Sequence, residues 1–210
     1  TVDSTNTYLK KQAADGASNF TLVAAGRQTA GRGRQGKIFF SPPSTGVYMS
    51  ALLRLPRPLT RAGLITVSAA VAAARAIDTL TGLRVGIKWV NDLFIGDRKV
   101  CGILTEAIGG LESGMLEAAV VGIGINITEP AGGFPPELQP IAGALGAAGI
   151  NRAELIAHTA CALFDLQSAP DGDLIDEYKR LSCVLGRRVR LTLGGAAREG
   201  EAVDINAEGN

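Results

Sequence analysis

The stretch RVGIKWVNDLFIGDRKVCGILTEAI, residues 84–108, decides the fold that we expect for this chain. It holds three apolar runs of strand character, and a fourth follows after a glycine-rich gap: 84–89, 93–95, 99–108 and 115–127. The first three runs are joined only by Asn91-Asp92 and Gly96-Asp97-Arg98, residues that are typical of tight turns. Parallel strands need a crossover of about a dozen residues or more, so these short connections predict an antiparallel meander.

Helix and strand patterns surround this meander on both sides. Apolar residues recur at helical spacing between Arg61 and Leu80, and the pattern stops at Gly82, which predicts a long buried helix. Further elements are expected as strands at 21–25 and 46–55 and as helices at 7–14, 152–166 and 174–181. We therefore predict an α+β fold in which helices pack on a mixed, largely antiparallel sheet.

The pattern changes after Cys183, which divides the chain into two expected units. Apolar residues now alternate on both sides of a Gly194-Gly195 turn: Val189, Leu191 and Leu193, then Ala202, Val203 and Ile205. This alternation predicts a β-hairpin. A unit this short cannot bury a core of its own, so it either docks on the rest of the chain or begins a module that is incomplete at Asn210. We expect a main domain over 1–183 and a small β module over 184–210.

Composition and charge narrow the classes of function. The 210 residues carry 21 Lys and Arg against 20 Asp and Glu, and a net charge of +1 gives no chain-wide basic field, so we expect no DNA binding from this chain. The longest apolar stretch, Leu64 to Ile77, is interrupted by Arg75 and is shorter than the roughly 20 residues that cross a bilayer. We expect no membrane span, and the start at Thr1 shows no targeting segment.

Cysteine, histidine and glycine usage adds three expectations. Cys101, Cys161 and Cys183 are odd in number and lack C-x-x-C spacing, so we expect reduced thiols in a cytoplasmic protein. His158 is the only histidine, which excludes a multi-histidine metal site, and we expect it to pack on the apolar face of its helix. The 27 glycines are about twice the ordinary share of roughly 7%, so turns and close backbone approaches are the places to look for function.

One loop concentrates glycine and positive charge. Residues 26–37, GRQTAGRGRQGK, which we call the Gly-Arg loop, hold four glycines and four cations without an acid, so backbone N–H and guanidinium groups can meet a phosphate or carboxylate. The dinucleotide fingerprint G-x-G-x-x-G and the start of a phosphate-binding loop both overlap here, but both require a helix next, and residues 38–43 are β-branched, aromatic and proline-broken. Ile38 also replaces the hydroxyl that would hold Mg²⁺. The alternative is a solvated surface loop.

Three further segments place polar groups at strand ends. Lys88 follows an apolar strand and precedes Trp89, and its charge is costly there unless it meets an anion; the alternative is a lysine that extends along a core tryptophan to solvent. Lys99 opens the next long strand, and Gly102 marks a close backbone approach. Residues 122–126, GIGIN, end in an amide that can read a base edge.

Taken in order, these segments resemble the biotin protein ligase family. Its motifs are matched by five stretches: Ser4-Thr5-Asn6, 28–36, 88–92, 99–106 and 122–126. The resemblance implies a catalytic domain of the class II synthetase type over 1–183 and the start of an SH3-like domain over 184–210. It also implies a monofunctional form without an N-terminal DNA-binding domain.

The resemblance implies a reaction in two steps. ATP activates biotin to biotinyl-5'-AMP with release of diphosphate, and biotin then passes to a lysine of a biotin carboxyl carrier domain, which belongs to a biotin-dependent carboxylase. Mg²⁺ is expected to be carried on the phosphates rather than in a protein cage. An exposed strand edge leaves a homodimer open.

The family pattern also implies roles for single residues. Those implied for biotin are Ser4, Thr5, Asn6, Gln28, Arg32, Gly33, Arg34, Lys99 and Gly102. Those implied for ATP and the adenylate are Arg32, Arg34, Lys88, Asn91, Asp92, Lys99 and Asn126. The implied catalytic residues are Lys88, Arg32 and Lys99. A carboxylate and a triphosphate repel each other, so fixed positive charge is needed where they meet.

Two positions depart from the family pattern, and three rival functions stay open. Phe39 stands where the family commonly has Trp, and Val90 stands where it commonly has Pro. Neither change removes a charge, so we expect altered affinity and not a lost reaction. The rivals are a lipoate or octanoyl transferase of the same general fold, a DNA-binding repressor that senses biotinyl-AMP, and a non-catalytic nucleotide-binding module.

Overall fold

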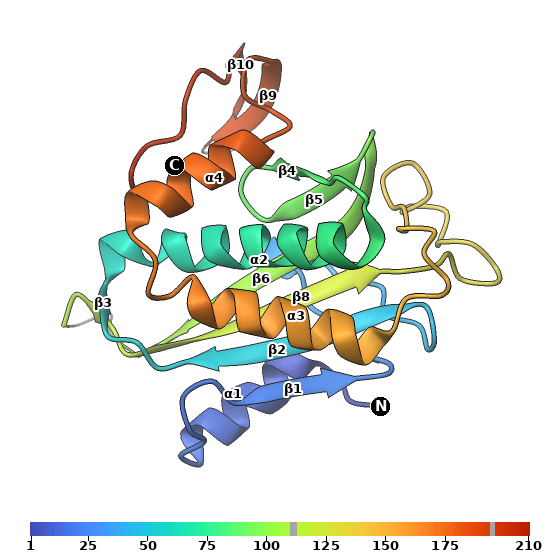
Figure 1. The fold of residues 1–210 in the computed structure, drawn as a ribbon, viewed down its shortest axis with the longest axis horizontal. Coiled ribbons are helices and arrows are strands. Elements are labelled where there is room, and N and C mark those ends of the chain that lie inside the picture. The colour runs from blue at the N-terminus through green and yellow to red at the C-terminus, as the bar shows by residue number, and fades with distance from the viewer. Residues whose placement is uncertain (110–112, 194–195) are drawn as a thin grey trace.

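A six-stranded sheet organises the protein (Figure 1). The structure is a computed structural model, and it describes residues 1–109, 113–193 and 196–210. The strands are β1 (Leu22–Ala25), β2 (Gly46–Leu53), β4 (Gly86–Lys88), β5 (Asp92–Ile95), β6 (Arg98–Ile108) and β8 (Ala118–Asn126). Their spatial order is β1-β2-β8-β6-β5-β4, and each neighbouring pair is antiparallel. The predicted meander is confirmed, because β4, β5, β6 and β8 lie side by side.

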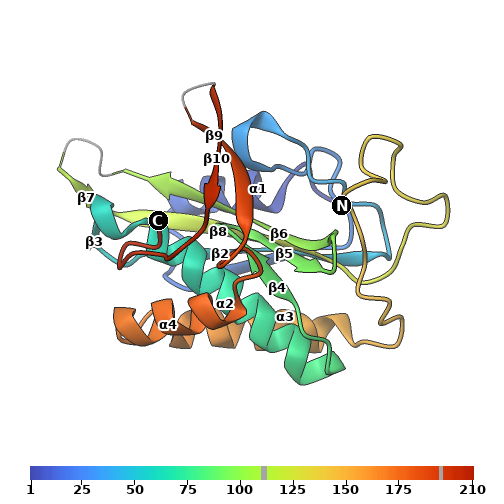
Figure 2. The same ribbon diagram turned by 90° about the horizontal axis from the view of Figure 1, so that it is seen from above.

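Helices cover the two faces of the sheet unequally. The elements on one face are α2 (Gly63–Thr81), α3 (Arg152–Asp165) and α4 (Asp171–Leu181), while α1 (Thr5–Ala14) lies on the other (Figures 1 and 2). Neighbouring residues of β6 identify the faces, because successive strand side chains point in opposite directions. Thr105 meets Thr66 of α2 at 2.8 Å, whereas Glu106 meets Asn6 of α1 at 2.9 Å. The predicted α+β architecture with packed helices is confirmed.

The long helix α2 supplies much of the core. Its apolar residues between Leu64 and Ile77 are buried against the sheet, α3 and α4. Within the described chain, Leu59–Thr81 is one helical segment long and apolar enough to cross a membrane by length and composition, but 67% of its apolar window is buried inside the protein. Arg75 interrupts this surface, and its Nε donates to Glu177 of α4 at 2.7 Å. Such burial is typical of a core helix, whose apolar surface is already covered.

On the α1 face, three glycines lower the surface of the sheet. Gly102 of β6 lies opposite Gly124 of β8, and Gly122 of β8 lies opposite Leu104 of β6. A Cβ atom at Gly122 would lie 2.2 Å from Asn6 Oδ1, and one at Gly124 would lie 2.4 Å from the Phe39 ring. Both separations exclude a larger residue. These glycines therefore form a floor, which we call the glycine floor, on which other side chains lie directly against backbone.

The first and last long helices begin earlier than the sequence predicts. α1 begins at Thr5, because Ser4 is its N-cap and its hydroxyl accepts from Thr7 N at 3.5 Å. Thr5 and Asn6 therefore lie in the first helical turn and not ahead of it. α4 begins at Asp171, and the aspartates of its first turn are favourable there because the amino end of a helix is partially positive.

Two small antiparallel pairs lie outside the main sheet. They are β3 (Arg57–Pro58) with β7 (Met115–Leu116), and β9 (Arg188–Leu193) with β10 (Ala196–Glu201). The C-terminal hairpin is confirmed, but its second strand is wrong by several residues. Ala202 still donates to Arg187 O at 3.0 Å, whereas Ile205 leaves the hairpin and joins the core. The predicted turn at Gly194-Gly195 lies outside the described residues.

Candidate active site

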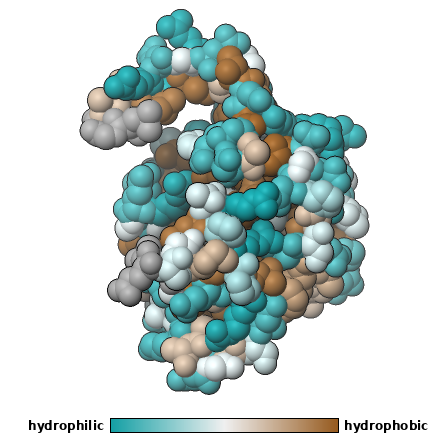
Figure 3. Space-filling model, turned by 90° about the vertical axis from the view of Figure 1, so that its left-hand side faces the viewer, coloured by the Kyte–Doolittle hydropathy of each residue, from teal (hydrophilic) through white to brown (hydrophobic). Residues whose placement is uncertain are grey.

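All the predicted site residues line one cleft of about 1040 Å³ over the glycine floor. They are Ser4, Thr5, Asn6, Gln28, Arg32, Gly33, Arg34, Lys88, Asn91, Asp92, Lys99, Gly102 and Asn126. Segments that are far apart in the sequence thus meet at one place. Val189 and Leu191 of the C-terminal hairpin also line the cleft. Figure 3 shows the C-terminal part of the chain projecting over a notch in the protein surface.

A buried polar network lies at one end of the cleft. Thr5 donates to Gln28 Oε1 through its backbone N at 2.8 Å and through its hydroxyl at 3.0 Å. Gln28 Nε2 donates in turn to Ser41 Oγ at 2.9 Å. Ser50 Oγ lies 2.7 Å from Thr5 Oγ1 and 2.6 Å from Asn6 Oδ1. Because these partners fix one another, the network presents hydroxyl and amide atoms in defined directions.

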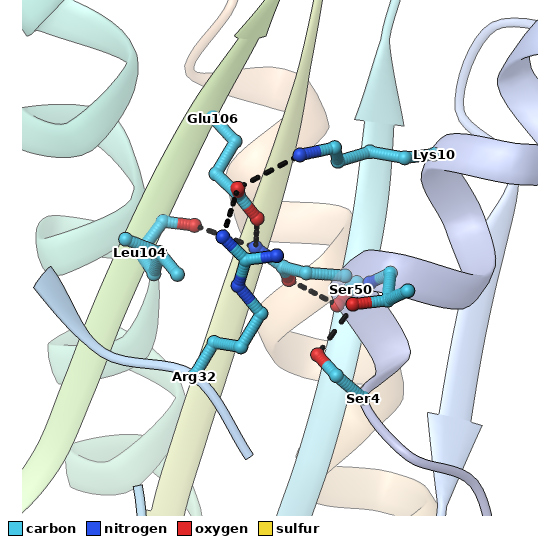
Figure 4. A network of polar contacts seen from close by, with 8 residues as sticks. Ser4, Lys10, Arg32, Ser50, Leu104 and Glu106 are labelled. Carbon is cyan, nitrogen blue, oxygen red and sulfur yellow. Dashed lines mark hydrogen bonds and ion pairs between the residues drawn. The ribbon is translucent and has the colours of Figure 1, made fainter. Parts of the chain in front are cut away.

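A carboxylate on β6 joins this network to the Gly-Arg loop (Figure 4). Glu106 Oε2 accepts from Asn6 Nδ2 at 2.9 Å, while Oε1 accepts from Lys10 Nζ at 2.9 Å and lies 3.1 Å from Arg32 Nη2. Burial raises the pKa of Glu106, but hydrogen bonds from Lys10 and Asn6 and the charges of Lys10 and Arg32 outweigh burial. The net pKa lies below the ordinary glutamate value, so Glu106 is ionised at neutral pH.

The Gly-Arg loop is an irregular turn beside the glycine floor. Arg34–Gly36 form one turn of 3-10 helix, and Gly33 N donates to Lys37 O at 2.7 Å. A Cβ atom at Gly31 would lie 2.3 Å from Phe39 O, so this position requires glycine. The next element after the turn is strand β2, not a helix. The prediction that no helix follows the loop is therefore confirmed, so the loop is neither a dinucleotide fingerprint nor a phosphate-binding loop of the usual type.

Polar partners hold the loop and strand cations in place. Arg34 Nη1 donates to Asn91 Oδ1 at 3.0 Å, and Lys99 Nζ lies 2.6 Å from Asp92 Oδ1. Arg32 is paired with the β6 carboxylate described above. These acids and amides offset the repulsion among neighbouring cations. An anionic ligand would take the place of these acidic and amide partners. The cations that bind it would already lie together in the cleft.

Lys88 differs from these cations in its surroundings, and the expectation that its neighbour Trp89 is a core residue is wrong. Lys88 is exposed, with Nζ 5.2 Å from the centre of the Phe94 ring, and it has no ion pair among the described residues. Trp89 is 49% exposed and donates to Gly209 O at 2.9 Å, so the core-tryptophan alternative is wrong.

The expectation that His158 packs on the apolar face of α3 is also wrong. His158 is exposed, because the buried stripe of α3 follows Leu155, Thr159 and Leu163 and passes beside it.

Asn126 closes the far end of the cleft. Its Nδ2 donates to Gly143 O at 2.9 Å, in the irregular connection between β8 and α3, so the amide has a fixed orientation. Phe134, Leu138 and Ile141 of the same connection line the cleft beside it. An amide next to apolar side chains suits a flat heteroaromatic ring that needs both stacking surface and a polar edge contact.

The sequence predicts no role for three members of the network. Ser50 carries a signal, because it is a hydroxyl within an apolar run at 46–55. Glu106 ends one of the quoted segments without an assigned task. Lys10 carries no signal, because its contact with Glu106 joins residues 96 positions apart and depends on how α1 packs.

Comparisons with known proteins agree with this geometry. Residues 1–126 match the model of the biotin/lipoate A/B protein ligase family. The chain is 40% identical over 160 residues to the bifunctional ligase/repressor BirA of Bacillus subtilis, a match covering 75% of this chain and 49% of that protein. It thus spans about half the length of that relative. It is 29% identical over 219 residues to a biotin–acetyl-CoA-carboxylase ligase of Mycobacterium tuberculosis, covering 98% of this chain and 78% of that protein.

Among solved structures, the fold is similar to a biotin protein ligase from Aquifex aeolicus in complex with biotin and ATP. The TM-score is 0.82 at 27% identity, and the match covers 99% of this chain and 86% of that one. A biotin protein ligase from Leishmania major, in complex with biotin, matches with a TM-score of 0.72 at 22% identity, over 91% of this chain and 83% of that one. This second likeness concerns the fold alone.

Proposed function

The chain belongs to the biotin/lipoate A/B protein ligase family, and from that premise we propose that it is an ATP-dependent biotin protein ligase. In this proposal it activates biotin to biotinyl-5'-AMP and transfers biotin to a lysine of a biotin carboxyl carrier domain. One observation carries the proposal. Cations, amides and hydroxyls from five separated segments converge on a single cleft, where a polar end and a cationic centre stand side by side.

The first step joins two anions, and the cleft offers what that requires. An oxygen of the biotin carboxylate attacks the α-phosphorus of ATP, a new P–O bond forms, and the bond to the β-phosphate breaks with release of diphosphate. Two unit charges about 4 Å apart repel by roughly 4 kcal/mol at an effective dielectric constant of 20. Arg32, Arg34, Lys88 and Lys99 supply the opposing charge, so positioning and electrostatics carry the reaction.

The cleft divides between the two substrates. We assign the polar end to biotin, where Ser4, Thr5, Asn6 and Gln28 match the donors and acceptor of its ureido ring, and Gly102 belongs to the same lining. Arg32, Gly33, Arg34 and Lys99 surround the activated carboxyl group. Lys88 meets the transferring phosphoryl charge, because its ammonium lies in the cleft lining and has no ion pair among the described residues. Asn91 and Asp92 complete the phosphate side, and Asn126 contacts adenine.

Mg²⁺ accompanies ATP in this proposal. Within residues 1–109, 113–193 and 196–210, no group of three or more His, Cys, Asp or Glu side chains lies together as a metal site. Asp92 is a carboxylate of the cleft lining, and it is paired with Lys99 at 2.6 Å. We therefore assign the ion to the phosphates themselves, where it reduces their negative charge.

The second step and the chain's organisation follow the same proposal. A carrier lysine attacks the acyl carbon of biotinyl-AMP, the C–N bond forms, and AMP leaves with the electron pair of the C–O bond. We propose residues 1–183 as the catalytic domain and 184–210 as the start of an SH3-like domain. Cys101, Cys161 and Cys183 are free thiols in the structure, which supports a reducing, cytoplasmic setting. A homodimer would form through β1, which is an edge of the sheet.

A transfer assay tests the function directly. The chain is incubated with labelled biotin, Mg²⁺-ATP and a biotin carboxyl carrier domain, and label on the carrier is measured together with released diphosphate. We expect label on the wild-type carrier and none on a carrier whose acceptor lysine is replaced by arginine. Lys88→Ala should slow diphosphate release by about 100-fold or more, whereas Lys11→Ala, outside the cleft, should not.

The outcomes separate the rival functions. Labelled lipoate in place of biotin should give no transfer, and preferential transfer of lipoate would contradict the choice of acyl group. Binding of ATP without diphosphate release under any of these conditions would support the non-catalytic nucleotide-binding module instead.

A further inference from the structure

Glu106 has no task in the reaction proposed above, yet it joins three parts of the site. It lies on β6 and contacts Asn6 and Lys10 of α1 and Arg32 of the Gly-Arg loop. Its side chain is only 15% exposed. A carboxylate beside a cleft for two anions is unfavourable by itself, because it repels both of them. Its presence there calls for a compensating effect.

The first effect concerns the orientation of the Asn6 amide. Glu106 Oε2 and Leu104 O can only accept hydrogen bonds, so both must face the NH₂ group of Asn6, at 2.9 Å and 3.3 Å (Figure 4). The amide oxygen is thereby turned towards Ser50 Oγ, 2.6 Å away. A neutral amide at position 106 offers a donor as well as an acceptor, so it no longer selects one orientation.

The second effect concerns Arg32. Its side chain extends from a glycine-rich loop and is 49% exposed, and its Nη2 is held 3.1 Å from Glu106 Oε1. Lys10 shares the same oxygen at 2.9 Å. Two cations and one carboxylate sum to +1, so the cluster keeps a positive charge beside the cleft. Glu106 therefore orders Arg32 without cancelling the charge that an anionic ligand needs.

We propose that Glu106 is a positioning residue for biotin, which sets the Asn6 amide and the Arg32 guanidinium in their binding geometry. This inference rests on the proposed function and deepens it. The competing explanation is purely structural: Glu106 only fastens α1 to β6 through Lys10. The two differ in what the removal of Lys10 does to biotin binding.

Direct binding of labelled biotin, without ATP, measures the positioning effect apart from catalysis. Glu106→Gln should raise the Kd for biotin by about tenfold or more. Lys10→Gln should raise that Kd clearly less than Glu106→Gln does, because Asn6 and Arg32 keep their carboxylate partner and only a charge on the α1 side is lost. In an Arg32→Gln background, Glu106→Gln should have a clearly smaller effect than in the wild type, because part of its action passes through Arg32.

Several results would overturn the inference. An unchanged Kd in Glu106→Gln contradicts it, and so does an equal loss in Lys10→Gln, which would establish the structural role. If Glu106→Gln does not fold, the double variant Lys10→Gln/Glu106→Gln removes both charges together and leaves no unpaired ammonium group. A wild-type Kd in that double variant also contradicts the inference. Failure of the wild type itself to bind biotin contradicts the proposed function instead, so the two failures are distinguishable.

Discussion

At the scale of single residues, Arg34 allows charge to be separated from loop shape. Its guanidinium reaches Asn91 at 3.0 Å, while the turn around it is set by backbone hydrogen bonds. Arg34→Gly should therefore keep the loop but lose a contact to the activated phosphate. We expect free biotinyl-AMP in solution to rise by about tenfold or more, measured as labelled adenylate passing a size filter. Arg27→Gly, an exposed residue of the same loop outside the cleft lining, is the control; an equal rise there would refute the role of Arg34.

The low pKa of Glu106 gives a second prediction at this scale. Its pKa is below the ordinary value of about 4.3, so its contribution to folding is fully present above that pH and is lost as pH falls through its folded-state pKa. Glu106→Gln should thus be less stable than the wild type at pH 7, and this difference should shrink as pH drops below about 4. Urea unfolding at several pH values measures it. Glu117→Gln, at an exposed glutamate outside this network, is the matched control.

How much of the site could be predicted depended on whether the signal was local. Lys88, Lys99 and the Gly-Arg loop place unusual residue types next to strand ends. This signal is local, so it can be recognised without the tertiary structure. The Lys10–Glu106 pair depends on how α1 packs on β6, and no spacing rule connects residues 96 positions apart. His158 was misplaced for a related reason, because a one-residue rotation about a helix decides between a buried and an exposed side chain.

At the scale of elements, the glycine-rich strands β6 and β8 shape the cleft. A Cβ at Gly124 would lie 2.4 Å from the Phe39 ring, so Gly124→Ala must push that ring towards the ligand space. We expect a loss of about 1–3 kcal/mol in folding stability and weaker biotin binding, measured by urea unfolding and by labelled biotin. The second change Phe39→Leu should recover stability by relieving the overlap. Gly132→Ala, outside the cleft lining and with open space around it, should leave both unchanged; an unperturbed Gly124→Ala would show that the floor is not needed.

Strand pairing could be predicted where short turns join the strands. It could not be predicted where a strand pairs through its backbone and its side chains show no apolar alternation. The turns around Asn91 and Gly96 leave the meander little choice of partner. β10 is made of small and charged residues, AAREGE, which are all exposed, so no alternation marks it as a strand. Its hydrogen bonds to β9 form anyway, and the alternating apolar residues that follow serve the core.

At the scale of the whole molecule, the C-terminal segment is bound to the main domain. Ile205 is 3% exposed within the main core, and Lys179 of α4 pairs with Asp204 at 2.7 Å. Trp89, at the end of β4, donates to Gly209 O at 2.9 Å. These contacts connect the hairpin that lines the cleft to the helices behind the sheet. Residues 204–209 therefore dock on the rest of the chain.

This docking predicts that one buried side chain near the C-terminus stabilises the whole fold. Ile205→Ala should lower the free energy of unfolding by about 2–5 kcal/mol, because it leaves a cavity in the shared core. Val203→Ala, two residues away and 80% exposed, should change it by less than about 0.5 kcal/mol. Fluorescence of Trp89, the only tryptophan, follows urea unfolding at the contact with the C-terminal segment. A single transition shifted to lower urea is expected for Ile205→Ala. An unshifted midpoint, or a separate early transition of Trp89 with the rest of the chain intact, would mean that the C-terminal segment folds as an independent attachment and does not hold the cleft wall to the core.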